Sequence, residues 1–439
     1  MASPLADYLS KHSLSAGDRV SLTWKNAPLE GTILPQPSDE QSFLKIKLDS
    51  GYNMGVALTN IQRIEKIAHP LASPAHLHDI PVPNSSPSAK RPGFSLIGVG
   101  GTIVSKVNYE TGGVIAKMTP AELSSIVPGI KEFSEIRNVV SPFTKMSEDN
   151  NPSDWVRIAQ ACHEELIKPD VEGVVVSHGT DTLHYTAAAL SFMLPSLSKP
   201  VVVVGSQRSS DRGSSDAEMN LICAVRLAVS DFAEVGTCMH GDTSDSFCFF
   251  IRGSSVRKMH TSRRDAFRPI NRLPLAKVWQ DGKIEVLSPF HKRSTGETKL
   301  DAVFEENVAL IKFFPGMSPS MLEDHVKRGC KGFVIEATGL GGVRKELIPA
   351  IHSVTQKGIP VFIVSQTIYG RVNLNVYSYG RQLQEAGAVG LEDMLSETAY
   401  VKLGWVLGHT KDMLKVKEMM LTNYAGEISL TSRADTFLN

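Results

Sequence analysis

The sequence has few cysteines, no excess of charge of either sign and no long apolar run. Its five cysteines are scattered over 439 residues, and no two of them form a CxxC pair. This spacing argues against a disulfide framework or a cysteine-rich zinc site, and it favours a reducing, cytoplasmic environment. No apolar stretch approaches the ~20 residues that span a bilayer, so we expect no transmembrane helix. Residues 1–18 also lack the basic-then-apolar pattern of a secretory signal.

The charge balance is even, with 46 lysines and arginines against 46 aspartates and glutamates. A neutral chain gives no global electrostatic sign of a nucleic-acid partner, so only a local patch can carry one. One basic segment, residues 252–272, holds seven basic residues and a single acidic one, Asp265. A solvated face or an interface is the usual interpretation of such a run, and contact with tRNA phosphates is a further alternative. We expect an interface or an active-site loop.

Turn residues and prolines divide the first quarter of the chain. Residues 18–66 hold short apolar stretches separated by turn residues, which predicts a small SH3-like or Sm-like β-barrel within residues 1–68. Such a barrel is equally compatible with a binding role and with a structural appendage. A short helix is expected to begin at Pro4, with Ser3 as its N-cap. Residues 69–93 hold six of the chain's 24 prolines and predict an extended linker.

Strands alternate with helices from residue 94 onward, which predicts an α/β fold with a mostly parallel sheet covered on both faces. The first set of expected strands is 94–99, 172–177, 200–204 and 235–239. The expected helices are 119–127, 152–167, 182–193 and 214–230. A polar stretch at 281–303 marks a domain junction, so we expect one α/β domain over 94–303 and a smaller one over 304–439. The second domain has strands expected near 308–313, 332–337 and 360–365.

The first chemically informative stretch is FSLIGVGGTIVS, residues 94–105. A buried strand stops at Gly100 and Gly101, where the absence of a Cβ lets the backbone turn sharply and approach a ligand. Thr102 follows at the C-terminal end of the strand, which is where open α/β sheets bind ligands. Taken alone, this stretch is better explained as a simple strand-to-loop turn, and the functional interpretation gains weight from a second turn of the same kind downstream.

A second stretch of the same kind is VVVSHGTDT, residues 174–182. Thr180 and Asp181 would lie at the tip of a strand parallel to the one that precedes Thr102. Two threonines and a carboxylate at neighbouring strand ends would form a polar cluster. The competing interpretation is that His178, Thr180 and Asp181 cap the helix that begins near residue 182. The pattern alone leaves the two open.

Lys258, in SSVRKMHTSRRDAF, is the third component, and we expect it to point inward from the basic segment. A threonine hydroxyl is a poor nucleophile at neutral pH and needs an adjacent base. A neutral lysine amine can serve, although a free lysine titrates near ~10.4. Burial and a nearby carboxylate act on the amine in opposite directions. We therefore expect Lys258, Asp181 and Thr180 to exchange protons as one coupled set.

The motifs GVGGTI at 98–103 and VVVSHGTDTLHYTA at 174–187 resemble the asparaginase/glutaminase family in sequence, order and separation. The resemblance covers roughly residues 94–425 and implies an amidohydrolase. It implies that Thr102 is the nucleophile, that Thr180 and Asp181 are the second threonine and its acid, and that Lys258 works with them.

The resemblance also implies substrate-binding residues. Ser147, in KMSEDNN, matches the serine that holds the substrate's α-carboxylate. Tyr109, in VNYETGG, is the candidate for a tyrosine on a mobile loop, at a shorter spacing than in bacterial asparaginases. Backbone N–H groups near Gly101 or at the Thr180 turn would stabilise the oxyanion. No metal and no organic cofactor is expected in this chain.

One branch of the family is more similar than the others. The N-terminal stretches GDRVSLTW and IKLDSGYNMGV, together with LSETAYVKLGWVLGHT at 395–410, resemble the D subunits of archaeal Glu-tRNA(Gln) amidotransferases. This resemblance implies a homodimer that pairs with an E-type subunit in a heterotetramer. The E-type subunit binds the tRNA and uses ATP and Mg²⁺, while the D subunit supplies ammonia from glutamine. A free-standing L-asparaginase and a non-enzymatic RNA-binding module are the competing hypotheses.

Overall fold

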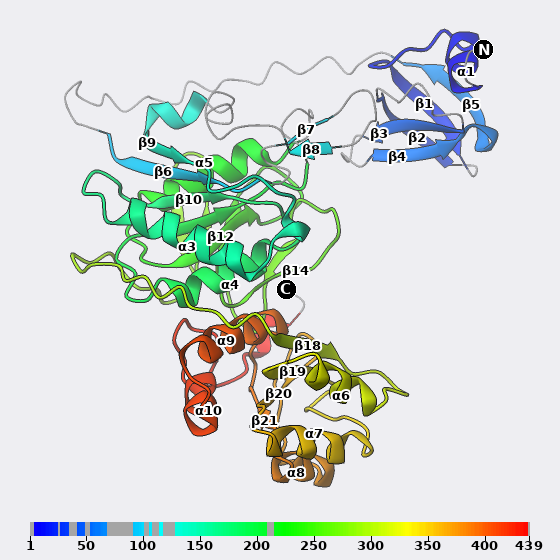
Figure 1. Ribbon diagram of the computed structural model, residues 1–439. Coiled ribbons are helices and arrows are strands. Elements are labelled where there is room, and N and C mark those ends of the chain that lie inside the picture. Colours follow the sequence, from blue (N-terminus) through cyan, green and yellow to red (C-terminus); the bar gives the residue numbers. More distant parts are fainter. Residues whose placement is uncertain are drawn as a thin grey trace. The chain divides into compact units, whose positions relative to one another are not determined.

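The computed structural model describes residues 4–24, 27–34, 42–48, 53–67, 91–100, 105–107, 114–116, 128–208 and 215–437. The chain divides into two compact units (Figure 1). One unit comprises Met1–Lys90 and Lys106–Ile115, and the other comprises Arg91–Ser105 and Ala116–Asn439. A short strand pair, β7 (Ser105–Val107) and β8 (Val114–Ala116), forms a separate two-stranded sheet.

The described residues before the linker form helix α1 and a five-stranded antiparallel sheet. Helix α1 spans Pro4–Lys11, as its proline at the first helical position predicts. The five strands, in the order β4-β3-β2-β1-β5, are β1 (Arg19–Trp24), β2 (Ala27–Ile33), β3 (Phe43–Leu48), β4 (Asn53–Ala57) and β5 (Ile61–Lys66). Alternate residues such as Val20 and Leu22 are buried, in agreement with the predicted strands. Closure of this sheet into an SH3-like or Sm-like barrel stays a prediction.

The larger unit is built on an eight-stranded sheet in the order β17-β16-β13-β12-β11-β10-β6-β9. Its parallel strands are β6 (Gly93–Gly98), β9 (Glu135–Val140), β10 (Val174–Ser177), β11 (Val201–Val204) and β12 (Val235–His240). Its antiparallel strands are β13 (Cys248–Arg252), β16 (Ala276–Val278) and β17 (Ile284–Val286). A hairpin of β14 (Val256–Lys258) and β15 (Phe267–Pro269) stands apart from this sheet.

Successive valines on the central strands belong to two different cores. Val174 and Val176 pack with helices α3 (Pro152–Leu166) and α4 (Leu183–Met193), whereas Val175 packs with α5 (Ala217–Ala228). Since side chains alternate along a strand, this division places helices on both faces of the sheet. The predicted parallel sheet and these three helices are therefore confirmed. The helix expected at 119–127 lies outside the described residues.

The C-terminal region forms a four-stranded sheet in the order β18-β19-β20-β21, paired in parallel throughout. These strands are β18 (Val308–Lys312), β19 (Gly332–Ala337), β20 (Val361–Ser365) and β21 (Val389–Gly390). The helices are α6 (Ser320–Lys327), α7 (Leu347–Gln356), α8 (Ser378–Glu385), α9 (Ser396–His409) and α10 (Met413–Leu421). Helix α9 contacts α4 as well as β18, β19 and β20, so it links the two sheets (Figure 1).

All five cysteines are buried, free thiols, so none of them forms a disulfide. Among the described residues, no helix has the length and apolar character needed to cross a membrane. Within the same residues, no group of three or more histidine, cysteine, aspartate or glutamate side chains has the arrangement of a metal site.

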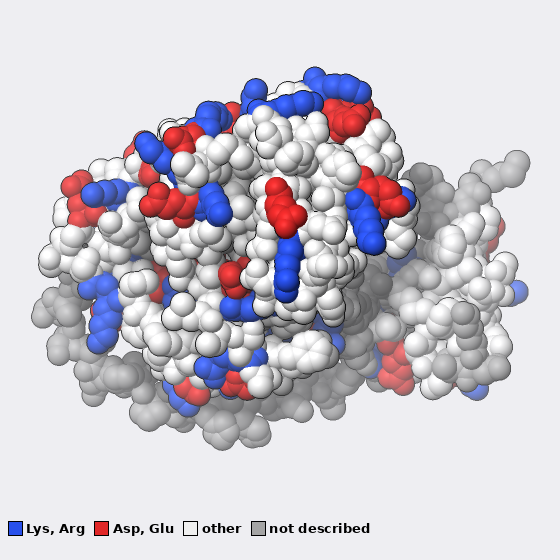
Figure 2. All heavy atoms as spheres, turned by 90° about the horizontal axis from the view of Figure 1, so that it is seen from below, with Lys and Arg blue, Asp and Glu red and all other residues white. Residues whose placement is uncertain are grey.

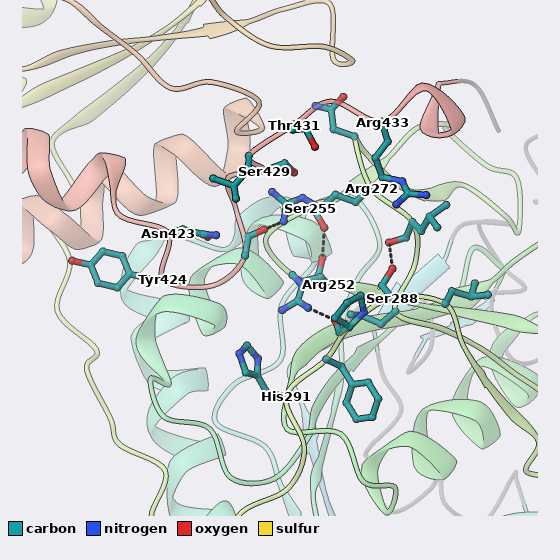
Figure 3. Close-up of a pocket in the computed structure, with 18 residues that line it drawn as sticks. Arg252, Ser255, Arg272, Ser288, His291, Asn423, Tyr424, Ser429, Thr431 and Arg433 are labelled. Atoms are coloured by element: carbon teal, nitrogen blue, oxygen red, sulfur yellow. Dashed lines mark hydrogen bonds between the residues drawn. The ribbon is translucent and has the colours of Figure 1, made fainter.

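A C-terminal strap, residues 423–433, contacts both the basic segment 252–272 and the C-terminal region. Its Ala425 carbonyl accepts a hydrogen bond from Ser254 Oγ at 2.7 Å, and its Ser429 carbonyl accepts one from Arg371 at 2.6 Å. Glu427 anchors the strap, because its carboxylate lies 2.6 Å from the ammonium of Lys402 on α9. Both side chains of this ion pair are fully buried. Figure 3 shows the strap beside a cavity of about 590 Å³ that it lines together with Arg252, Arg272 and His291.

The buried Lys402–Glu427 pair gives a stability prediction. Lys402→Met should lower the free energy of unfolding by about 3–5 kcal/mol, because it leaves the Glu427 carboxylate buried without its cation. The double variant Lys402→Met/Glu427→Gln should recover much of that loss, since no unpaired charge remains. Urea unfolding of the three proteins tests this account. Equal stability of Lys402→Met and wild type would contradict it.

Candidate active site

Three of the residues singled out from the sequence converge in the structure. The ammonium of Lys258 donates to Thr180 Oγ1 at 2.9 Å and to Asp181 Oδ1 at 2.6 Å. Lys258 comes from the hairpin strand β14, whereas the other two follow β10. The Lys258 side chain is 10% exposed and that of Asp181 is 64% exposed. The lysine therefore points inward, as expected, while one side of the carboxylate is open to solvent.

Capping does not explain these side chains. Helix α4 has Thr182 as its N-cap residue, and no side chain makes a capping hydrogen bond there. Thr180 and Asp181 accept from Lys258 instead. The capping alternative is therefore wrong for this turn. The arrangement combines an amine, a hydroxyl and a carboxylate, which are the groups needed for proton transfer around a nucleophile.

Ser147 is held against the same turn. It opens a short 3₁₀ turn, Ser147–Asp149, and is buried. Thr182 Oγ1 donates to the Ser147 carbonyl at 2.6 Å. This bond joins the segment that follows β9 to the segment that follows β10.

Gly100 lies against the backbone of Lys145, a contact that the sequence did not predict. Its φ is +109°, and an added Cβ would lie only 2.1 Å from the Lys145 carbonyl oxygen. Lys145 is itself fixed by Asp154, whose two carboxylate oxygens lie 2.9 and 2.7 Å from its Nζ. Only glycine fits this contact between the end of β6 and the segment that leads to Ser147.

His178 is a buried neutral histidine whose hydrogen bonds join segments of the site. Its Nδ1–H donates to the Gly179 carbonyl at 2.7 Å, so Nε2 is left to accept. Thr186 Oγ1 lies 2.9 Å and Asn150 Nδ2 lies 3.1 Å from Nε2. Complete burial lowers the pKa of His178 to about 4, which keeps the ring neutral. His178 thus connects Asn150, just after the Ser147 turn, to the chain that leads into Thr180.

A second polar cluster lies next to Lys258 along the chain. Arg257 Nη1 forms a 2.6 Å ion pair with Glu397 Oε1 in the first turn of α9. His184 Nε2 lies 3.9 Å from the same carboxylate oxygen, and its Nδ1 is buried without a hydrogen-bond partner. Burial first, and then the charges of Arg257 and Lys258, lower the pKa of His184 to about 3. The sequence analysis missed this cluster, because its members are distant along the chain and form no motif.

The seven cations of the basic segment 252–272 are paired within the fold with six carboxylates, since Asp265 is shared by two of them. Each cation lies within 4.0 Å of a carboxylate oxygen, in the pairs Arg252–Glu234, Arg257–Glu397, Lys258–Asp181, Arg263–Asp265, Arg264–Asp245, Arg268–Asp265 and Arg272–Asp393. The run therefore supports the hairpin and the candidate site rather than a basic surface. Positive and negative side chains are also interspersed on the face seen in Figure 2.

Three residues of interest, Gly101, Thr102 and Tyr109, lie outside the described residues. The described chain reaches Gly100, two positions before Thr102. The cavity of Figure 3 contains none of Thr180, Asp181 and Lys258 among its lining residues, so it is separate from the candidate site.

Three family models match the chain. Residues 94–291 match "Asparaginase, N-terminal", residues 307–420 match "Glutaminase/Asparaginase C-terminal domain", and residues 14–67 match "GatD N-terminal domain".

Relatives named as the D subunit of glutamyl-tRNA(Gln) amidotransferase are similar over nearly the whole chain. The one from Thermococcus kodakarensis is 50% identical, with 98% of each chain covered. The one from Sulfolobus acidocaldarius is 44% identical, with 98% of this chain and 95% of the relative covered.

Solved structures of free asparaginases share the fold of the larger unit. The thermostable L-asparaginase from Thermococcus kodakarensis aligns with a TM-score of 0.70 at 31% identity, covering 77% of this chain and 100% of that one. L-asparaginase I from Vibrio cholerae aligns with a TM-score of 0.67 at 26% identity, covering 78% of this chain and 100% of that one. The predicted asparaginase-type α/β fold, with its N- and C-terminal parts, is confirmed.

The buried histidines give a prediction about acid stability. His178 and His184 have pKa values of about 4 and about 3 in the folded protein, below the ordinary value near ~6.5. The unfolded chain therefore binds more protons as the pH falls below ~6.5, and each histidine removes up to about 1.4 kcal/mol of stability per pH unit until its folded pKa is reached. His184→Gln should flatten this loss between pH ~6.5 and ~4.

Chemical unfolding at a series of pH values measures the effect. His352→Gln, at an exposed position on α7, is the matched control and should keep the wild-type pH dependence. The same pH dependence in His184→Gln and wild type would contradict the assignment of His184 as a buried neutral group.

Proposed function

This chain belongs to the family of glutamyl-tRNA(Gln) amidotransferase D subunits, and we propose that it releases ammonia from glutamine for a partner that converts Glu-tRNA(Gln) to Gln-tRNA(Gln). The observation that carries this proposal is the extent of the similarity. Relatives of that name match 98% of the chain, whereas the asparaginase structures cover 77–78% of it. The N-terminal residues 14–67 match the model of the GatD N-terminal domain. The amidotransferase subunit is therefore favoured over a free-standing asparaginase.

Thr102 is the proposed nucleophile. Its hydroxyl oxygen attacks the side-chain carbonyl carbon of glutamine, and its proton passes to Lys258 in its neutral amine form, directly or through the hydroxyl of Thr180. The 2.9 Å contact between Lys258 and Thr180 supports this route. The resulting oxyanion is stabilised by backbone N–H groups near Gly101 or at the Thr180 turn. Collapse of the intermediate breaks the C–N bond and returns the proton to the leaving nitrogen as ammonia.

Water then hydrolyses the γ-glutamyl ester on Thr102, which yields glutamate and restores the free hydroxyl.

Ser147 and Asp181 are proposed to bind the α-carboxylate and the α-ammonium of glutamine, and Tyr109 is the candidate loop tyrosine. The 64% exposure of Asp181 supports its role with the ammonium, since the carboxylate is accessible from solvent. Asp181 thus serves Lys258 and the substrate together.

The proposed assembly follows from the name of the relatives, which describes one component of a larger enzyme. We propose a cytoplasmic heterotetramer in which a homodimer of this chain pairs with E-type subunits that use ATP and Mg²⁺ and contact most of the tRNA. The internal pairing of the basic segment supports a minor role for this chain in tRNA binding.

The proposed domains are residues 1–68, 94–303 and 304–439, and residues 69–93 are the proposed linker. No metal or cofactor is proposed for any of them.

Substitutions at the two central residues test the chemistry. Thr102→Ala should reduce ammonia release from glutamine by roughly 10⁴-fold or more, because no covalent intermediate can form. Lys258→Met should reduce it by roughly 10²–10⁴-fold through loss of the proton acceptor. Lys327→Met, at an exposed position on α6, is the control and should keep wild-type activity. A folded, active Thr102→Ala protein would remove Thr102 from the mechanism.

The partner test separates the amidotransferase subunit from a free asparaginase. Ammonia release from glutamine and from asparagine is measured for the chain alone and with the E-type subunit and Glu-tRNA(Gln). We expect glutamine turnover to rise when the partner and the charged tRNA are present. Full turnover of asparagine by the chain alone, unaffected by the partner, would instead identify a free-standing asparaginase.

A further inference from the structure

Glu397 is a buried carboxylate that reaches the strand of Lys258 from the C-terminal region. It is 5% exposed and forms its 2.6 Å ion pair with Arg257, the residue immediately before Lys258 on β14. Neighbouring side chains on a strand point to opposite faces. Arg257 therefore ties β14 to α9 on one face, while Lys258 reaches Thr180 and Asp181 on the other.

A second set of bonds holds the start of the same segment. Thr398 Oγ1, next to Glu397 on α9, donates to the Ser254 carbonyl at 2.9 Å. Ser254 Oγ in turn donates to the Ala425 carbonyl of the strap at 2.7 Å. The chain from Ser254 to Lys258 is thus held at both ends by the C-terminal region.

Arg257 is the cation that balances Glu397. The other groups near this carboxylate are His184 and Tyr185 from α4, Glu336 from β19 and Ser396 from α9. His184 is held neutral, because burial lowers its pKa to about 3. Burial raises the pKa of Glu397, and Arg257 offsets that effect only in part. The position of Glu397 in the first turn of α9 favours its charged form as well.

We propose that Glu397 is a positioning residue for amide hydrolysis, which acts through Arg257 to hold β14 so that the amine of Lys258 stays within reach of Thr180. The inference rests on the proposed function, because it assigns Glu397 a role in that reaction. It also gives α9 a part in catalysis although α9 contributes no group that touches the reacting atoms. Among the described residues, Glu397 and Arg257 form no hydrogen bond or ion pair with Ser147 or Asp181, so we expect a smaller effect on glutamine binding than on kcat.

Glu397→Gln tests the inference in the full chain assembled with its partner subunit. Displacing a catalytic group by about 1 Å costs on the order of 10²-fold in rate. Glu397→Gln should therefore lower kcat for glutamine by roughly 10- to 100-fold, with KM changed by less than about 3-fold. Arg257→Met should have the same effect, and the double variant Arg257→Met/Glu397→Gln should be no worse than either single one, since the two residues act through one contact.

Glu234→Gln is the matched control. Glu234 is also 5% exposed and forms a 2.7 Å ion pair with Arg252 of the same basic segment, without holding β14. Both carboxylate variants should lose stability, but only Glu397→Gln should lose kcat. Equal kcat in Glu397→Gln and Glu234→Gln, or an effect of Glu397→Gln confined to KM, would overturn the inference.

The assay distinguishes this inference from the proposed function. If the wild-type assembly hydrolyses another amide rather than glutamine, the proposed substrate is wrong, and the same variants are then compared on that amide. A selective loss of kcat in Glu397→Gln there would still support the positioning role. Wild-type kcat in both Glu397→Gln and Arg257→Met on the hydrolysed amide would refute that role whichever substrate is correct.

Discussion

The candidate site depends on one interaction. The Lys258 ammonium contacts both the Thr180 hydroxyl and the Asp181 carboxylate. A lysine that is 10% exposed carries a desolvation cost, and a carboxylate at 2.6 Å offsets it. The hydroxyl at 2.9 Å gives the same amine a route for a proton. The parallel sheet makes the site possible, because β6, β9 and β10 run in the same direction. The segments that follow these three strands therefore begin at the same end of the sheet.

The two parts of the larger unit contribute differently to this contact. The eight-stranded sheet supplies Thr180, Asp181 and the Ser147 turn, while the C-terminal region holds the hairpin that carries Lys258. Helix α9 makes that second contribution, since it packs against α4 and the smaller sheet and presents Glu397 to Arg257. Free asparaginases share this α/β architecture, so the fold alone does not separate their function from that of an amidotransferase component. The N-terminal domain and the near-complete similarity to the amidotransferase relatives make that distinction.

Much of this organisation could be predicted from local sequence. Valine-rich runs such as 174–177 and 201–204 predicted buried parallel strands, and the glycine pair that begins at Gly100 predicted a turn in a conformation that favours glycine, although not its contact with Lys145. The inward orientation of Lys258 was also expected, although its sequence neighbours are basic. The ion pairs of the basic segment could not be predicted, because a run of cations does not show which distant carboxylates face it. The roles of His178 and Glu397 could not be predicted for the same reason. They arise from tertiary contacts with Asn150, Thr186 and Arg257.

The most direct test of the central claim is to trap the covalent intermediate. The protein is mixed with glutamine, quenched with acid within its first turnover, and analysed by mass spectrometry of the proteolytic peptides. The account predicts a γ-glutamyl adduct on the peptide that contains Thr102 in the wild type, and a much slower appearance of that adduct when Lys258 is replaced by methionine. An adduct on another residue, or one that forms equally fast without the lysine, would contradict it.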